Sequence, residues 1–147
     1  MGRASIDSTL FQKFWVDKAQ EIGGFASQFK PSKVKSMKVR VDQGMWMTFV
    51  QRSDHVRSEL YIYRGPDKYH ETEDLYKWFQ QNREKIDSSY GPGLEWNPEE
   101  NRNACRIEHI FPGFDLEDQY CWEEYCIKSI HSMNNLHAAL NPFLEEI

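Results

Sequence analysis

Eight basic and aromatic side chains are the residues of this sequence whose types and spacing point to chemistry. They are Lys38, Arg40, Trp46, Arg52, Arg57, Tyr61, Tyr63 and, later in the chain, Arg106. Most of them fall at alternate positions within short extended runs, and alternate residues of a strand point to the same face of a sheet. Cationic groups bind phosphates and rings stack on bases. We therefore predict that these eight residues form a binding face on one side of a sheet.

Three uses of this face fit the residue types. Single-stranded nucleic acid would bind there through both the cations and the rings. A partner protein, or a second copy of the chain in a homodimer, would find a charged surface that contains rings. Cross-strand pairs of aromatic and charged residues also stabilise a sheet without any ligand. Arg106 lies two positions before Glu108, so the face is mixed in charge, which favours a protein interface over nucleic acid.

Three glutamates, Glu59, Glu95 and Glu108, are the candidates for catalysis because they fall in expected strands. A metal-dependent nuclease of the restriction-enzyme type needs an Asp and then Glu-x-Lys on a short strand, to hold a divalent metal and a catalytic lysine. Tyr61 and Ile110 stand where the runs that begin at Glu59 and Glu108 would need that lysine. A small metal-dependent nuclease is therefore an alternative, and the pattern favours a protein without catalytic residues.

The remaining site chemistries have no matching pattern in the sequence. The five histidines include no H-x-x-x-H pair, and the three cysteines include no C-x-x-C pair, so no zinc site is expected. The glycine-rich segment 91–93 comes before an expected strand, whereas a phosphate-binding loop comes before a helix. We predict no metal and no cofactor.

Length and composition indicate one domain over residues 1–147. The chain has 147 residues, 39% hydrophobic residues and a formal net charge of −5, which is typical of a globular protein and argues against coating nucleic acid through bulk charge. It has no apolar run of about 18 residues and no signal peptide. Its odd number of cysteines is typical of reduced thiols. These features predict a cytoplasmic protein that does not contact a membrane.

The hydrophobic periodicity predicts an α+β fold. Apolar residues at helical spacing predict helices over Ser5–Ile22, Glu71–Ser88 and Asp118–Leu140. Alternating residues predict strands over 37–41, 45–52, 56–63, 94–96 and 103–111. Short turns at 42–44 and 53–54 require an antiparallel meander. We expect an antiparallel sheet of about five strands in the order αβββαββα, with the helices packed on one face.

Several segments resemble an uncharacterised prokaryotic family, a domain of unknown function often found C-terminal to restriction-nuclease-like domains. The similar features are the Phe14-Trp15 helix, the turn at Gly44, the strand Glu59–Ile62, the pair Glu95-Trp96 followed by the Arg106-Ile107 strand, and the segment Trp122–Tyr125 that opens the last helix. This resemblance implies a role beside DNA metabolism, restriction or defence against foreign DNA. It brings no catalytic residues, and the sequence lacks the nuclease-like partner domain.

The residues and the resemblance together predict a non-catalytic binding module. We expect it to be linked to DNA metabolism, restriction or phage defence, and to contact a protein partner or nucleic acid through the outer face of its sheet. A phage-encoded antagonist of host defence, which would bind a host protein or a small signalling molecule, is the alternative of a different class.

Overall fold

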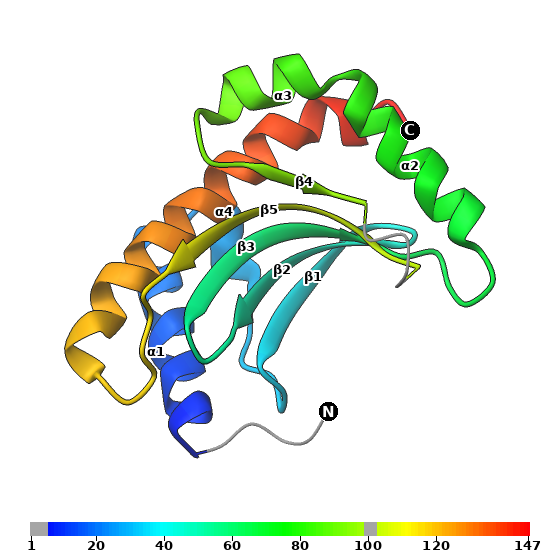
Figure 1. Ribbon diagram of the computed structural model, residues 1–147. Coiled ribbons are helices and arrows are strands. Elements are labelled where there is room, and N and C mark those ends of the chain that lie inside the picture. The colour runs from blue at the N-terminus through cyan, green and yellow to red at the C-terminus, as the bar shows by residue number, and fades with distance from the viewer. Residues whose placement is uncertain (1–5, 99–102) are drawn as a thin grey trace.

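A computed structural model describes residues 6–98 and 103–147 of the chain (Figure 1). Its helical elements are α1 (Ile6–Ile22), η1 (Phe25–Gln28), α2 (Tyr69–Gln81), α3 (Arg83–Tyr90), η3 (Gln119–Cys121) and α4 (Trp122–Leu144). Its strands are β1 (Ser36–Asp42), β2 (Met45–Gln51), β3 (His55–Ile62), β4 (Glu95–Asn97) and β5 (Cys105–Pro112). None of the helices in this described part combines the length and the hydropathy needed to cross a membrane.

The five strands form one antiparallel sheet in the order β1-β2-β3-β5-β4. The hairpin between β1 and β2 turns at Gly44, whose φ of 74° is costly for residues with a side chain. A Cβ atom at this position would also collide with Cδ of Arg64 and lie 3.1 Å from the carbonyl oxygen of Tyr63. Glycine is therefore required by both the turn and the close approach of the chain that leaves β3.

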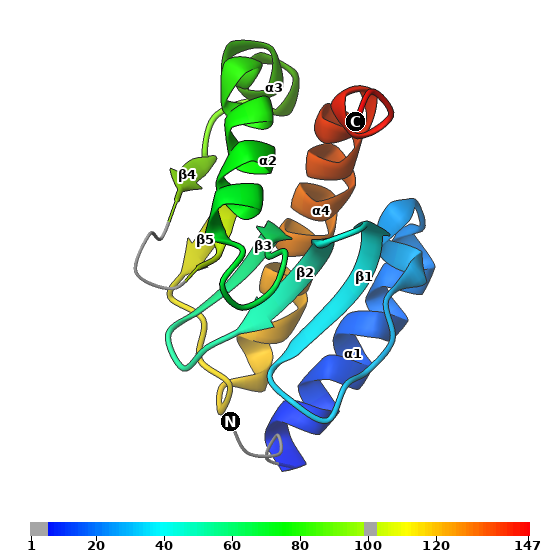
Figure 2. The ribbon, with the colours of Figure 1, turned by 90° about the vertical axis from the view of Figure 1, so that its right-hand side faces the viewer.

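The long helices α1 and α4 cover one face of the sheet and leave the other face free of them (Figure 2). Alternation along β2 explains this division, since Met45, Met47 and Phe49 point into the helix layer and are almost completely buried. Hydrogen bonds also join the two helices to each other and to the sheet. Trp15 of α1 donates from Nε1 to Oγ of Ser129 in α4 over 2.8 Å, and Ser58 Oγ of β3 donates to the Ser129 carbonyl over 2.7 Å.

The predicted fold class is confirmed, with a difference in the second helix. The segment predicted as one helix over Glu71–Ser88 forms two, which meet at Asn82. Asn82 has φ −107° and ψ 15°, outside the helical range, and its side-chain amide donates to the Trp78 carbonyl over 2.9 Å. The Trp78 indole in turn donates to the Phe143 carbonyl at the end of α4 over 3.1 Å. The break therefore lets α2 and α3 each follow its own packing surface.

The last helix also differs from its expected bounds. The sequence predicts it over Asp118–Leu140, but the first turn is the 3₁₀ helix η3 and α4 continues to Leu144. Pro142 lies inside its last turn, where an interrupted hydrogen bond matters less than in the middle of a helix. Leu144 is buried against the core, which explains why the helix extends past the proline.

Candidate binding surface

The strand register places the predicted binding residues on one face, which we call the outer face. Trp46 of β2 is paired with Arg40 of β1 and with Tyr61 of β3, and Tyr61 is paired with Arg106 of β5. These four residues form a row across the sheet. Since the paired residues of neighbouring strands share a face, the side chains two positions away along each strand lie beside this row.

The next two rows of the outer face surround a hollow of about 240 Å³. It is lined by Ser36, Lys38, Thr48, Val50, Arg52, Arg57, Glu59, Tyr61 and Arg106. Five of the eight predicted residues thus meet in one place. Trp46 and Tyr63 lie beside it, since the Trp46 ring lies 5.2 Å from Nζ of Lys38 and the Tyr63 ring lies 6.3 Å from that of Tyr61. Arg40 donates from Nε to the Asp42 carbonyl over 3.3 Å and lines a separate hollow at the edge of the sheet.

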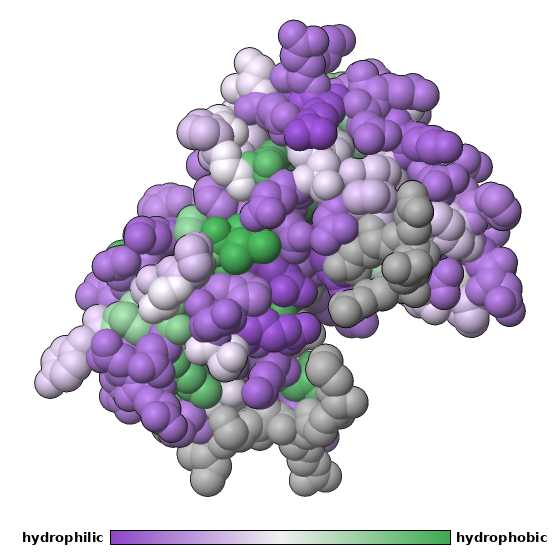
Figure 3. Space-filling model, viewed as in Figure 1, coloured by the Kyte–Doolittle hydropathy of each residue, from purple (hydrophilic) through white to green (hydrophobic). Residues whose placement is uncertain are grey.

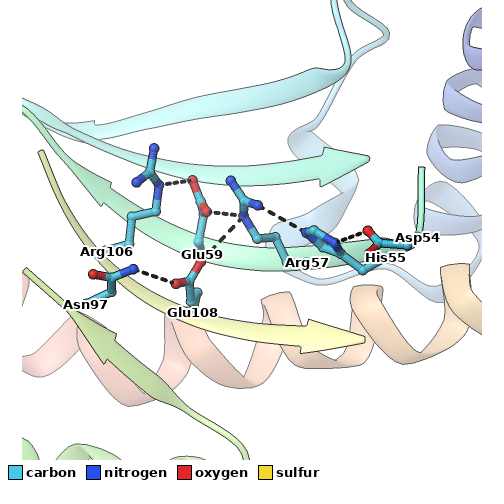
Figure 4. Close-up of polar contacts among 7 residues, drawn as sticks. All are labelled: Asp54, His55, Arg57, Glu59, Asn97, Arg106 and Glu108. Atoms are coloured by element: carbon cyan, nitrogen blue, oxygen red, sulfur yellow. Dashed lines mark hydrogen bonds and ion pairs between the residues drawn. The ribbon is translucent and has the colours of Figure 1, made fainter. Parts of the chain in front are cut away.

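Two arginines and two glutamates form a buried ion network beneath the hollow (Figure 4). Arg57 Nε lies 2.7 Å from Oε1 of Glu59 and 3.5 Å from Oε1 of Glu108, and Arg106 Nε lies 3.5 Å from Oε2 of Glu59. The Glu59 side chain is 2% exposed and that of Glu108 is 7% exposed. Buried carboxylates need such partners, because an isolated buried charge is strongly unfavourable.

The two carboxylates of this network repel each other because β3 and β5 place Glu59 directly opposite Glu108. Burial, and next the charge of Glu59, raise the pKa of Glu108 above its usual value, while Arg57, a hydrogen bond from Asn97 and Arg106 act to lower it. The Asn97 amide donates to Oε2 of Glu108 over 3.5 Å. The two guanidinium groups therefore hold together a pair of like charges that the strand register forces into contact.

The network continues along β3 through His55 (Figure 4). Arg57 Nη1 donates to Nε2 of His55 over 3.1 Å, since a guanidinium can only donate. Nδ1 of His55 then carries the proton and donates to Oδ1 of Asp54 over 2.8 Å. This hydrogen bond is the first cause that lowers the pKa of Asp54. The Arg57 side chain is thus held by the two glutamates at one side and by His55 at the other.

Lys38 and Arg52 differ from the arginines of the network. Among the ion pairs between described residues, none involves either side chain, although both line the hollow. Burial lowers the pKa of Arg52, and the nearby charge of Arg57 lowers it further. Four cations and two carboxylates leave a formal surplus of two positive charges here, in a chain of net charge −5. The hollow is therefore suited to an anionic group.

The glutamates considered for metal catalysis are arranged differently from a metal site. Glu59 and Glu108 face the arginines, while Glu95 is opposite Glu108 in the register and is exposed. Within residues 6–98 and 103–147, no group of three or more His, Cys, Asp or Glu side chains is placed to hold a metal ion. A sequence signal for the ion network did exist: Arg57 precedes Glu59, and Arg106 precedes Glu108, by two positions on the same face.

The surface around these elements is largely polar. In the view of Figure 3, hydrophilic side chains cover most of the molecule, and hydrophobic atoms form small areas separated by them. One exposed aromatic side chain, Tyr120 of η3, is 99% exposed.

Comparisons with known proteins identify the family. No curated protein matches the chain. Among solved structures, a chain of the "Structure of the HopA1-SchA Chaperone-Effector Complex" is similar over 89% of this chain and 98% of that chain, with 9% sequence identity and a TM-score of 0.39. The family model described as "Domain of unknown function (DUF4268)" matches residues 10–144. The chain therefore belongs to this family of unknown function.

Proposed function

We propose that this chain is a non-catalytic binding module, which holds an acidic segment of a partner protein on the outer face of its sheet. One observation carries the proposal: Lys38 and Arg52 line the hollow without a carboxylate partner among the described residues, above arginines that already have theirs. An incoming carboxylate would relieve the repulsion between Arg52 and its cationic neighbours. Charge-assisted hydrogen bonds of this kind are stronger than neutral ones.

The rings of the outer face favour a protein partner over nucleic acid. Lys38 Nζ lies 5.2 Å from the Trp46 ring, and the Arg106 guanidinium lies 5.0 Å from the Tyr61 ring. A base that stacked on either ring would compete with these cations. The buried carboxylates of Glu59 and Glu108 would also repel a phosphate backbone that followed the sheet. An acidic segment avoids the first conflict because carboxylates do not stack on rings, and in the hollow it meets four cations against the carboxylate of Glu59.

The proposal extends to the setting in which the module acts. Its sequence resembles domains often found beside restriction-nuclease-like domains, so we propose a partner protein in DNA metabolism, restriction or phage defence. The family itself is one of unknown function, and the proposed setting therefore depends on the resemblance. Copurification of the tagged chain from a prokaryotic host, with the Arg52→Gln variant as the control, would test the setting separately from the binding chemistry.

Substitution of Arg52 by glutamine tests the binding face. The probes are a fluorescein-labelled peptide rich in Asp and Glu and a labelled single-stranded oligonucleotide of equal charge, followed by fluorescence anisotropy at low and moderate salt. We expect Arg52→Gln to weaken peptide binding about tenfold, or about 1.4 kcal/mol. The matched control is Lys85→Gln, which removes one exposed cation from α3 and should leave binding almost unchanged.

Two outcomes would contradict the proposal. Equal weakening by Arg52→Gln and Lys85→Gln would show attraction by overall charge and not by the hollow. Tighter binding of the oligonucleotide than of the peptide, lost in Arg52→Gln, would assign the face to nucleic acid instead. Because Arg52 forms no ion pair with another described residue, its replacement should leave folding intact, and urea denaturation would verify this.

A further inference from the structure

Strand β1 is one edge of the sheet, and its backbone is oriented to accept another strand. The backbone N–H of Gln51 donates to the Lys35 carbonyl over 2.9 Å. In the antiparallel register this makes Met37–Phe49 and Val39–Met47 the hydrogen-bonded pairs. The N–H and C=O groups of the residues between them, Ser36, Lys38 and Arg40, therefore point away from β2. These groups form a row along the outer edge of β1.

Hydrogen-bonded and non-hydrogen-bonded pairs also alternate between β2 and β3. This pattern supports the assignment of the outward-pointing backbone groups in β1. The N–H of Tyr63 donates to the Gly44 carbonyl over 2.8 Å, and that of Arg52 donates to the His55 carbonyl over 2.9 Å. In the β2–β3 register these bonds make Trp46, Thr48 and Val50 the residues of β2 that bond to β3. Met47 and Phe49 are left to bond to β1. The direction of the backbone groups from Ser36 to Arg40 then follows, up to the irregularity in the register between Arg40 and Asp42.

The helix side of β1 is only partly covered. Val39 and Val41 point toward the helix layer but are half-buried, unlike Met37, which is 1% exposed. The segment that leads into β1 is held against α1, since the backbone N–H of Ser32 donates to Oε1 of Gln12 over 2.7 Å. In Figure 2 this segment lies between β1 and α1. An added strand with apolar residues opposite the two valines would complete the layer over them.

Charge along this edge selects the kind of strand that fits. Lys33, Lys35, Lys38 and Arg40 lie on β1 or just before it, and the first acidic residue after Glu21 is Asp42. Lysine on an edge strand opposes pairing with like strands. A second copy of β1 would place cations opposite cations, which is destabilising. An acidic strand meets opposite charges instead.

We propose that the acidic partner segment binds as a sixth strand along β1, an inference that rests on the proposed function of the outer face. Its acidic side chains lie opposite Lys38 and Arg40 on the outer face, next to the hollow, and its apolar side chains lie opposite Val39 on the helix side. The partner segment thus alternates acidic and apolar residues. Backbone hydrogen bonds to the edge hold it, and the alternating side chains select it.

Amide hydrogen exchange tests this placement directly. In the free protein the N–H groups of Ser36, Lys38 and Arg40 should exchange rapidly, while those of Met37 and Val39 should exchange slowly because they bond to β2. The probe is a short peptide of alternating glutamate and valine, and the control peptide has the same composition with its glutamates and valines in two blocks. Binding of the alternating peptide should protect the amides of Ser36, Lys38 and Arg40.

Two substitutions of Lys38 separate the contribution of the backbone N–H at the edge from that of the positive charge. Lys38→Ala removes the cation and keeps the N–H, whereas Lys38→Pro removes both. Proline is tolerated on an edge strand where the N–H points outward, and the extended Met37 before it suits the residue preceding a proline. We expect Lys38→Pro to bind the alternating peptide about fivefold more weakly than Lys38→Ala, the effect of one lost hydrogen bond.

The results distinguish this inference from the proposed function. If Arg52→Gln weakens binding but Lys38→Pro and Lys38→Ala bind equally, and no edge amide gains protection, the outer face binds the peptide and the added strand is wrong. If neither Arg52→Gln nor Lys38→Ala weakens binding, the proposed function itself is wrong. If the block peptide binds as well as the alternating one, the edge does not select an extended strand, and the inference is likewise overturned.

Discussion

Leu60 and Glu59 are neighbours in β3 on opposite faces of the sheet, and both are almost completely buried, at 0% and 2% exposure. The cause of burial differs. Leu60 is covered by the helix layer and belongs to the apolar core. Glu59 is covered by other charged side chains, those of Arg57 and Arg106. The helix-covered face is therefore held by packing, and the outer face by a fixed arrangement of charges.

This difference separates two kinds of cation on the outer face. Arg57 and Arg106 are needed to neutralise buried carboxylates, so they serve stability first. Lys38 and Arg52 line the hollow and form no ion pair with another described residue, so we propose them as the cations that meet the ligand. A rigid, paired floor also pre-orients the hollow, because the guanidinium groups of the floor cannot turn away from it without leaving Glu59 and Glu108 unpaired.

The largest expected effect comes from the helix-covered face. Leu60→Ala should lower the free energy of unfolding by about 2–5 kcal/mol, because it removes buried methyl groups and leaves a cavity in a close-packed core. The measurement is urea denaturation followed by tryptophan fluorescence. Leu10→Ala is the matched control, since Leu10 is 48% exposed, and should change stability by less than about 0.5 kcal/mol. Similar values for the two variants would mean that β3 does not pack as described.

The second effect tests whether charges hold the outer face. Glu59→Ala should lower the free energy of unfolding by about 3 kcal/mol, because Arg57 and Arg106 would remain half-buried without their main partner. Glu95→Ala provides the control: this glutamate lies on β4, on the far side of β5 from Glu59, and is exposed. A cost for Glu59→Ala no larger than for Glu95→Ala would remove the distinction between paired and available cations.

The division of the sheet into two faces was predictable from the sequence, whereas the sequence signals the ion network only as two separate Arg-x-Glu pairs and does not predict the contact between them. Alternation of Met45, Met47 and Phe49 with Trp46 and Thr48 decides which side chains are buried, because strand geometry is local. Contact between Glu59 and Glu108 depends on β5 lying between β3 and β4. Nothing local determines that order, since two helices and a short strand separate β3 from β5 along the chain.

The break in the second helix and the pairing role of the arginines were also not predicted. Both involve contacts between residues that are distant in sequence, which local patterns do not reveal. Helical spacing continues through Asn82, while the contact with α4 next to the break, from Trp78 to the Phe143 carbonyl, joins residues distant in sequence. The Arg-x-Glu pattern at Arg57 and Arg106 places each charge pair on one face. Only the register brings the two pairs together and buries them, which turns two of the eight predicted binding residues into the floor of the hollow.

The smallest expected effect concerns the pH dependence of stability at Glu108. Its pKa is raised in the folded protein, by burial first and then by Glu59, above the usual value of 4.5. Folding therefore favours the protonated form, and the contribution of this group to stability is present below pH 4.5 and is lost as the pH rises through the folded-state pKa. Because Arg57, Asn97 and Arg106 oppose the rise, the loss should be modest.

Comparison with Glu108→Gln isolates this contribution, because the other titrating groups are shared by both proteins. Urea denaturation from about pH 4 to pH 7 should show the wild type losing stability relative to Glu108→Gln as the pH increases. The opposite trend would mean that the arginines dominate and hold Glu108 ionised. In that case the floor of the hollow would be a fully charged network, and its surplus of positive charge would not increase on acidification.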